Sequence, residues 1–370
     1  MHSELLLVIV VGAALAFDFT NGFHDTANVV AASISTKALS PRTAVSIAAA
    51  LNFAGAFISL KVAATIGSGI FATDRITETI VFAGLIGAIA WNLVTWFFGL
   101  PSSSSHALIG GVTGAMLAAV GGGGVQGQAL IRTVVAPALV APMLAFVVAG
   151  ISIVIVYRLV GRRRPGIVTD GFRLGQVAST GMLSLAHGTN DAQKTMGVIA
   201  LALVAHGSIS MKHFYVPTWV IVAAASVIAL GTYAGGWRII RTVGTRIIKM
   251  DVAQGFTAQG AGAAVILASS HFGYPLSTTH VISGGIMGAG AAKRLSAVRW
   301  GVAGNIAAAW ILTLPAAGLA GAVTYGVTDI FGAGALGPIL ITILALGVLG
   351  SVLVHRGRSP YPGSQARVHA

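Results

Sequence analysis

The stretch that decides the fold reads Ala186-His187-Gly188-Thr189-Asn190-Asp191-Ala192-Gln193-Lys194-Thr195. It places an acid, bases and several polar side chains inside a long apolar run, where each is costly. A rougher copy early in the chain reads Asn21-Gly22-Phe23-His24-Asp25-Thr26-Ala27-Asn28. The two copies align when Gly22 is laid on Gly188 and Asp25 on Asp191. The duplication indicates two related halves organised around these motifs.

The composition is that of a polytopic membrane protein. Of the 370 residues, 55% are hydrophobic and 8% are charged, and the mean hydropathy is +0.87. This leaves too little polar surface to cover a soluble globule of that length. The net charge of +13 comes from basic residues in short loops between apolar runs, so membrane orientation explains it better than nucleic acid does. There is no cysteine, which excludes disulfides and thiolate metal sites.

The apolar runs and the basic loops together predict the topology. Lys and Arg concentrate on one side if the N-terminus faces out, the C-terminus faces the cytoplasm, and two overlong segments enter and leave on the same side. We therefore expect seven crossings and two re-entrant hairpins. The segments that carry polar motifs are expected to be helices broken near mid-membrane. The apolar segments are 5–36, 43–66, 79–120, 129–157, 173–205, 214–236, 252–292, 300–324 and 335–354.

The hairpin segments, 79–120 and 252–292, contain a second duplication. The first reads Pro101-Ser102-Ser103-Ser104-Ser105-His106-Ala107-Leu108-Ile109-Gly110-Gly111. It aligns without gaps on Pro275-Leu276-Ser277-Thr278-Thr279-His280-Val281-Ile282-Ser283-Gly284-Gly285. The predicted domains are tandem units over 1–160 and 165–330, followed by a final helix and a basic tail over 331–370. Because the two units enter the membrane in opposite directions, the fold expected is an all-α inverted-repeat secondary transporter.

The tips of the hairpins are candidate anion sites. A Pro followed by Ser and Thr predicts a turn and an N-cap, so the free N–H groups of the next half-helix point into the protein. Two such ends, converging with neutral hydroxyl donors, suit a compact tetrahedral oxyanion. The alternative is that each hydroxyl only caps or bonds to its own helix. The hydroxyls concerned belong to Ser103, Ser104, Ser105, Ser277, Thr278 and Thr279.

The acids of the two motifs predict a site for a coupling ion. Asp25 and Asp191 would repel a nearby anion unless a cation or proton lies between them, and buried carboxylates in a membrane are candidates for function. Neutral oxygens for the ion, or donors for the anion, are available from Asn28, Asn190 and Gln193.

Other buried polar residues leave two interpretations open. Asp18 lies seven residues before Asp25 and is either a structural acid or a further member of the same cavity. His187 and the duplicated His106 and His280 either take part in the site or bond to neighbouring backbone.

Taken together, the four motifs resemble the inorganic phosphate transporter (PiT) family. The resemblance covers both halves of the chain, and it implies import of orthophosphate by cation symport, an inverted-repeat core and a homodimer. Arsenate, which is nearly isosteric, should enter by the same route. The resemblance also implies that the hairpin Ser and Thr residues contact phosphate, and that the Asp and Asn residues of the motifs serve coupling cations. Asn28 and Gln193 are further candidates for contact with phosphate.

Two departures from the family pattern bear on the coupling ion. Many members repeat Asn-Asp followed by Asn, whereas this chain has His24 before Asp25 and Lys194 after Asp191. The departures resemble bacterial low-affinity permeases that take up phosphate, or a neutral metal phosphate, with protons across the plasma membrane. The Lys194 ammonium can act as a tethered monovalent cation opposite Asp191. Protons are therefore the predicted coupling cation, with sodium as the alternative.

A divalent metal carried with phosphate is a further possibility for the coupling site. A histidine can exchange a proton near neutral pH or ligate a metal. The metal ligands expected in that case are His24 and Asp25.

Functions of other classes fit the sequence less well. A sulfate permease would use the same hairpins. An intramembrane hydrolase would use Ser103 as nucleophile and His106 as base, but it needs one asymmetric nucleophile, whereas both halves carry the motif. We therefore expect no enzyme. Arg162 to Arg164 are expected to anchor the chain at the cytoplasmic surface, with lipid head groups as incidental partners.

Overall fold

The computed structural model describes residues 2–332 and 334–358, and within this part the regular elements are helices, apart from an isolated bridge between Phe71 and Val125. The basic tail expected beyond residue 358, including Arg367, lies outside the described residues. The first half contains α1(His2–Ser35), α2(Pro41–Gly55), α3(Lys61–Ser68), α4(Glu78–Phe98), α5(Ser104–Val120), η1(Gly121–Gly124), α6(Gly127–Leu130), η2(Ile131–Val135) and α7(Ala136–Val160). The second half contains α8(Pro165–Ala205), η3(Met211–His213), α9(Thr218–Ala234), α10(Trp237–Arg241), η4(Thr242–Arg246), α11(Val252–His271), α12(Thr278–Ala291), η5(Leu295–Ala297) and α13(Trp300–Asp329), and α14(Leu336–Arg358) follows.

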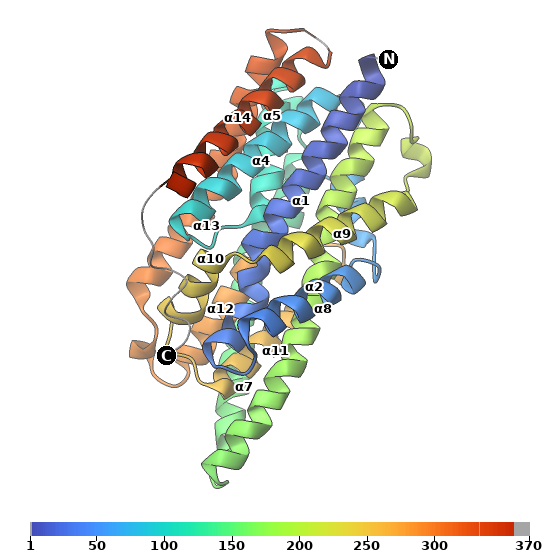
Figure 1. Cartoon of the computed structure of the whole chain (residues 1–370). Helices are drawn as coiled ribbons and strands as arrows, with labels where there is room; N and C mark the ends of the chain where they lie inside the picture. Colours follow the sequence, from blue (N-terminus) through green and yellow to red (C-terminus); the bar gives the residue numbers. More distant parts are fainter. Residues whose placement is uncertain (1, 333, 359–370) are drawn as a thin grey trace.

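The two halves repeat the same order of elements in opposite directions. The hairpin α4–α5 lies toward the end of the molecule that holds the N-terminus, whereas α11 and α12 lie toward the opposite end (Figure 1). The tips of the two hairpins meet between these ends, where the Ser105 hydroxyl donates to the Leu276 carbonyl over 3.0 Å. The architecture is the all-α inverted repeat with two hairpins that the sequence predicts.

The breaks in the helices differ from the expectation. The motif-bearing helices α1 and α8 are continuous, and the chain breaks instead in the next span of each half. Residues 56–60 separate α2 from α3, and a bend of 59° after Ala234 separates α9 from α10 and η4. The physical reason is that polar side chains of α1 and α8 find partners on other helices, as Asp25 does with Ser104 of α5 and Asn190 with Ser270 of α11, so their own backbone does not need to unwind.

Local signals define the hairpins. Helix α4 begins at the N-cap Thr77, whose hydroxyl accepts from Ile80 N, and it ends at Gly99, which has a left-handed φ of 66° that glycine adopts without strain. Ser103 and Ser277 then cap α5 and α12. Both caps are buried, so both half-helices begin inside the protein.

Glycines allow the motif helices to approach their neighbours closely. A Cβ on Gly22 of α1 would lie 3.0 Å from the Cα of Gly231 on α9. A Cβ on Gly188 of α8 would lie 2.7 Å from the Cα of Asn52 on α2. Each motif helix thus packs against the second span of the other half, which ties the two repeats together.

Within the described residues, five helices are long and apolar enough to cross a membrane, and a sixth span is formed if the bent pair α9 and α10–η4 is counted as one. Helices α7 and α13 expose large apolar side chains such as Leu139, Met143, Ile311 and Leu319. Since such a surface needs lipid rather than water, the protein is integral to the membrane. The count of seven crossings stays a prediction, because α2 is short and α8 is less apolar.

Candidate functional site

The centre of the molecule holds buried carboxylates from α1 and α8. Asp25 is 1% exposed and Asp191 is 0% exposed. One ligand atom from each of Asp25, His187 and Asp191 lies within 4.8 Å of the others. The acids of the two sequence motifs, which are 166 residues apart in the chain, therefore form one cluster.

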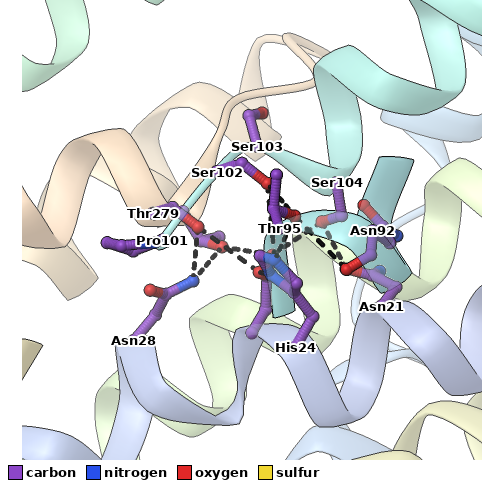
Figure 2. Close-up of polar contacts among 12 residues, drawn as sticks. Asn21, His24, Asn28, Asn92, Thr95, Pro101, Ser102, Ser103, Ser104 and Thr279 are labelled. Carbon is purple, nitrogen blue, oxygen red and sulfur yellow. Dashed lines mark hydrogen bonds and ion pairs between the residues drawn. The ribbon is translucent and has the colours of Figure 1, made fainter. Parts of the chain in front are cut away.

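Hydroxyl donors from both hairpins converge on Asp25. Ser104 Oγ lies 2.7 Å from Asp25 Oδ2 and 2.6 Å from Asn21 Oδ1, so its single proton has two acceptors. From the other hairpin, Thr278 donates to Asp25 Oδ2 and Thr279 to Asp25 Oδ1, each over 3.3 Å. Figure 2 shows the hairpin residues facing the side chains of α1 across this centre. The geometry provides one point at which an acceptor group receives donors from both repeats.

The contacts follow the internal symmetry of the sequence. Thr278, which aligns with Ser104, also donates to Asp191 over 3.5 Å, as Ser104 does to Asp25. Asn28 Nδ2 donates to Thr279 Oγ1 over 2.8 Å. In the other half, the corresponding pair is Lys194 and Ser105. Each hairpin therefore contacts the acid of its own repeat and the residue three positions after the acid of the other repeat.

Lys194 is a fully buried cation whose donors are all used. Its Nζ donates to Asp191 Oδ1 over 2.6 Å, to the Leu276 carbonyl over 2.7 Å and to the Ser105 hydroxyl. The side chain is 1% exposed. An ammonium has three donors and no acceptor, so this set satisfies it completely.

His24 connects Asp25 to the first hairpin. Its Nδ1 lies 2.8 Å from Asp25 Oδ1, and its Nε2 lies 3.2 Å from Thr95 Oγ1 and 3.4 Å from Ser102 Oγ. Ser102 in turn donates to Thr95 over 2.8 Å. The imidazole is therefore held between the Asp25 carboxylate and the turn that follows α4. Figure 2 shows His24 beside Thr95 and Ser102.

Ser103 and Ser277 line the site as helix caps. The Ser103 hydroxyl accepts from His106 N over 3.1 Å, and Ser277 accepts from His280 N over 3.3 Å. These caps keep the positive ends of α5 and α12 aimed at the centre. Because Ser103 is bonded to the backbone of His106, its geometry is that of a cap rather than of a nucleophile beside a base.

Two predicted site residues are bonded outside the hairpin tips. Gln193 Oε1 accepts from the backbone N–H groups of Val62 and Ala63 over 2.9 and 3.2 Å, so it caps α3. Its amide N–H donates to the Thr189 carbonyl. Asn190 Nδ2 donates to Ser270 Oγ over 2.8 Å and to the Tyr274 carbonyl over 3.2 Å, which ties α8 to the second hairpin. The contacts of Gln193 are those of a structural residue, although the sequence suggests an anion contact.

The structure adds members that sequence reasoning did not assign to the site. Asn21 and His187 occupy equivalent positions four residues before the two motif acids, so each shares a helical face with its acid. His187 Nε2 lies 3.3 Å from Asp191 Oδ2, and this helical spacing was the available signal. Ser102 belongs to the duplicated hairpin motif, whereas Thr95 joins the site only through packing and had no signal in the sequence.

The charges of the site restrict what it can bind. Among the described residues at the centre of the molecule, the buried carboxylates of Asp18, Asp25 and Asp191 accompany one buried ammonium, that of Lys194. An anion that approaches the hydroxyl donors meets uncompensated negative charge unless a proton or cation comes with it. The arrangement can therefore bind an oxyanion together with positive charge.

Comparison with known proteins identifies relatives over most of the chain. The model of the phosphate transporter family matches residues 21–169 and again residues 163–321. A "Probable low-affinity inorganic phosphate transporter" of Mycobacterium leprae is 54% identical over 88% of this chain and 79% of that protein. Proteins of the same name from Rhizobium meliloti and Bacillus subtilis are 49% and 43% identical, over 97% and 96% of their own lengths. The relatives are transporters by name, not enzymes.

One solved structure, described as "The sodium-dependent phosphate transporter", has the same fold. It superposes with a TM-score of 0.81 at 24% sequence identity. The match covers 88% of this chain and 99% of that one. The likeness extends over both repeats.

Proposed function

The chain belongs to the phosphate transporter family, and on this premise we propose that it imports inorganic phosphate across the cell membrane by secondary active symport with protons. The observation that carries the proposal is the convergence of Ser104, Thr278 and Thr279 on Asp25. Phosphate oxygens accept hydrogen bonds as a carboxylate does, so the same hydroxyls can serve a bound phosphate. The half-helix ends of α5 and α12 add favourable dipoles.

The acids near these donors favour phosphate over sulfate. Phosphate keeps at least one proton near neutral pH, and that proton can be donated to Asp25 or Asp191. Sulfate has no proton to donate there and would face two carboxylates unshielded. We expect arsenate to compete with labelled phosphate for uptake and sulfate to compete at least 100-fold less well. Equal competition by sulfate would favour a general oxyanion permease.

Lys194 supports protons over sodium as the coupling cation. Its ammonium lies among a carboxylate, a carbonyl and a hydroxyl, which are the ligand types that sodium takes in transporters. A tethered cation at this point leaves one sodium position without a use. In proteoliposomes, phosphate uptake should then rise with an inward proton gradient in the absence of sodium and collapse with a protonophore. Uptake that needs sodium and ignores the protonophore would contradict the proposal.

The anion site is tested by removing one hydroxyl from each hairpin. Each hydrogen bond to a charged group contributes about 1.5 to 3 kcal/mol, so Ser104→Ala with Thr278→Ala should lower phosphate affinity about 100-fold or more. The measurement is uptake of labelled phosphate at matched protein levels in the membrane. Ser226→Ala with Thr324→Ala is the matched control, because both hydroxyls bond only to carbonyls of their own helices. A double hairpin variant that transports normally would refute the converging-hairpin site.

A divalent metal carried as cargo with phosphate is a second candidate. The spacing of Asp25, His187 and Asp191 within 4.8 Å supports it, with His187 in the position that the sequence assigned to His24. Such a metal would neutralise the two carboxylates that face the anion. Uptake of labelled calcium that follows phosphate one for one, and loss of both with a chelator, would favour this form of substrate. The homodimer implied by the resemblance stays a prediction.

A further inference from the structure

Asp18 is a buried acid that the phosphate site leaves without a role. It lies on α1, two helical turns before Asp25, and is 0% exposed. Its Oδ1 accepts from Thr195 Oγ1 on α8 over 2.8 Å, and its Oδ2 has no hydrogen-bond partner among the described residues. An ionised carboxylate in such a position is costly unless it is paired.

The other two buried aspartates differ in this respect. Asp25 is contacted by His24 and by three hydroxyls, and Asp191 is contacted by Lys194 and His187. No ion pair to Asp18 occurs in the described part of the chain. An unpaired buried carboxylate of this kind is neutralised most readily by binding a proton.

The scaffold does not require an acid at this position. In the alignment of the two motifs, Asp18 corresponds to Ser184, whose hydroxyl donates to the Thr180 carbonyl of its own helix over 2.7 Å. The second half thus forms the same helix with a neutral residue that needs no partner. Because the acid occurs in only one of the two repeats, its role is not shared by the equivalent position of the other repeat.

The surroundings of Asp18 connect it to the site. The charged side chains that act on it most strongly are Asp191 and Lys194, both on α8. Its partner Thr195 directly follows Lys194 in the chain. The other helices packed against this part of α1 contribute few titratable groups: Glu78 of α4 pairs with His206 at the N-terminal end, and Tyr233 of α9 is 61% exposed. Asp18 is therefore linked to α8, and so to Asp191 and Lys194, through its hydrogen bond with Thr195.

Nearby polar atoms also lack partners. Asn21 Nδ2, one turn after Asp18, and Asn92 Oδ1 on α4 are buried without a hydrogen bond among the described residues. Asn21 also accepts from Ser104 at the tip of the first hairpin. Asn21 thus lies between Asp18 and the hairpin hydroxyl of Ser104 along α1. The unpaired donor of Asn21 and the unpaired acceptor of Asn92 suit a neighbouring group that changes its protonation.

We propose that Asp18 is the residue that carries the coupling proton. The Asp18 carboxylate takes up one proton when phosphate binds from one side, and it releases this proton to the water on the other side after the protein has changed its access. The inference rests on the proposed phosphate–proton symport and assigns its proton to a residue outside the phosphate contacts. Protonation removes one of the three negative charges in the centre, which is what allows the anion to bind.

The test compares net transport with exchange in Asp18→Asn, which is fixed in the neutral form. Proteoliposomes with an entrapped pH dye report protons moved per phosphate, and labelled phosphate on both sides reports exchange. We expect Asp18→Asn to exchange phosphate but to lose proton movement and accumulation at least 10-fold, with Asp18→Glu restoring both in part. Asp329→Asn, the same change at an exposed position, is the matched control.

The outcomes distinguish the proposed phosphate–proton symport from the role of Asp18 in it. Wild-type protein that moves phosphate without protons would overturn the proposed symport itself. Wild-type protein that moves protons, with Asp18→Asn moving them at the same ratio, would overturn only the role of Asp18. If Asp18→Asn is inactive in both assays, Thr195→Val decides, because it removes the donor that favours the charged carboxylate. The pH profile of uptake must then move up by about one unit, and an unmoved profile would overturn the inference.

Discussion

Lys194 is the residue that most clearly distinguishes the two halves, because its equivalent in the first half is the neutral Asn28. Removing one partner of a buried ion pair costs about 3 to 5 kcal/mol, since the other charge remains buried. Lys194→Asn should therefore lower the free energy of unfolding in detergent by this amount and reduce phosphate uptake at least 10-fold. Sodium should restore part of both, because it can occupy the space between Asp191, Ser105 and the Leu276 carbonyl.

The same assays show whether the Lys194 ammonium replaces a bound cation or has only a structural role. Lys61→Asn is the matched control, because Lys61 lies exposed at the start of α3. Equal stability and uptake of Lys194→Asn with and without sodium would show that the ammonium does not stand in for a cation.

The sequence predicts some of these residue contacts and misses others for a physical reason. Asp25, Asp191 and the hairpin hydroxyls are predictable as neighbours because their motifs are duplicated, and chance is a poor explanation for such a pattern. The contact of Gln193 with α3 joins two segments that are 131 residues apart in the chain. No local pattern encodes such a contact, so the sequence alone does not identify the partners of this side chain.

The close approach of α1 and α9 provides a test at the level of helix packing. Gly22→Ala would bring a Cβ to 2.5 Å from the Ile228 carbonyl and 3.0 Å from the Cα of Gly231. The helices must then separate, at a cost of about 1 to 3 kcal/mol, and the motif shifts relative to the hairpin tips. Thermal unfolding and phosphate uptake should both fall.

A second glycine of α1 supplies the control. Gly12 has nothing within 4 Å of an added Cβ, so Gly12→Ala should keep full uptake and gain up to about 1 kcal/mol from helix propensity. If the two variants behave alike, the packing of α1 on α9 does not position the site.

The hairpins are predictable from the sequence, whereas the helix breaks are not. Both hairpins carry a Pro at the turn and a Ser two residues later, and this Ser caps the next helix. A break in a membrane helix depends on what surrounds it. The polar motifs of α1 and α8 suggest unwound backbone, but side chains from other helices satisfy them, so the backbone remains helical.

The two ends of the molecule differ in their charged contacts. At the N-terminal end, His206 joins Glu78 over 2.8 Å and Glu4 over 3.4 Å, which brings α1, α4 and α8 together. At the opposite end, Lys293 lies 3.4 Å from Asp251, and the Tyr157 hydroxyl donates to the same acid over 2.7 Å. The α7–α8 turn, with Arg162 to Arg164, lies at this second end (Figure 1).

This distribution predicts the orientation of the protein in the membrane. Because basic loops are retained on the cytoplasmic side, the end with the α7–α8 turn should face the cytoplasm and the N-terminal end should face out. The chain has no cysteine, so single cysteines can be introduced directly. A membrane-impermeant maleimide should label Asp74→Cys in intact cells, and it should label Arg163→Cys only after the cells are permeabilised. Labelling of Arg163→Cys in intact cells would reverse the orientation, and with it the side from which Asp18 takes its proton during import.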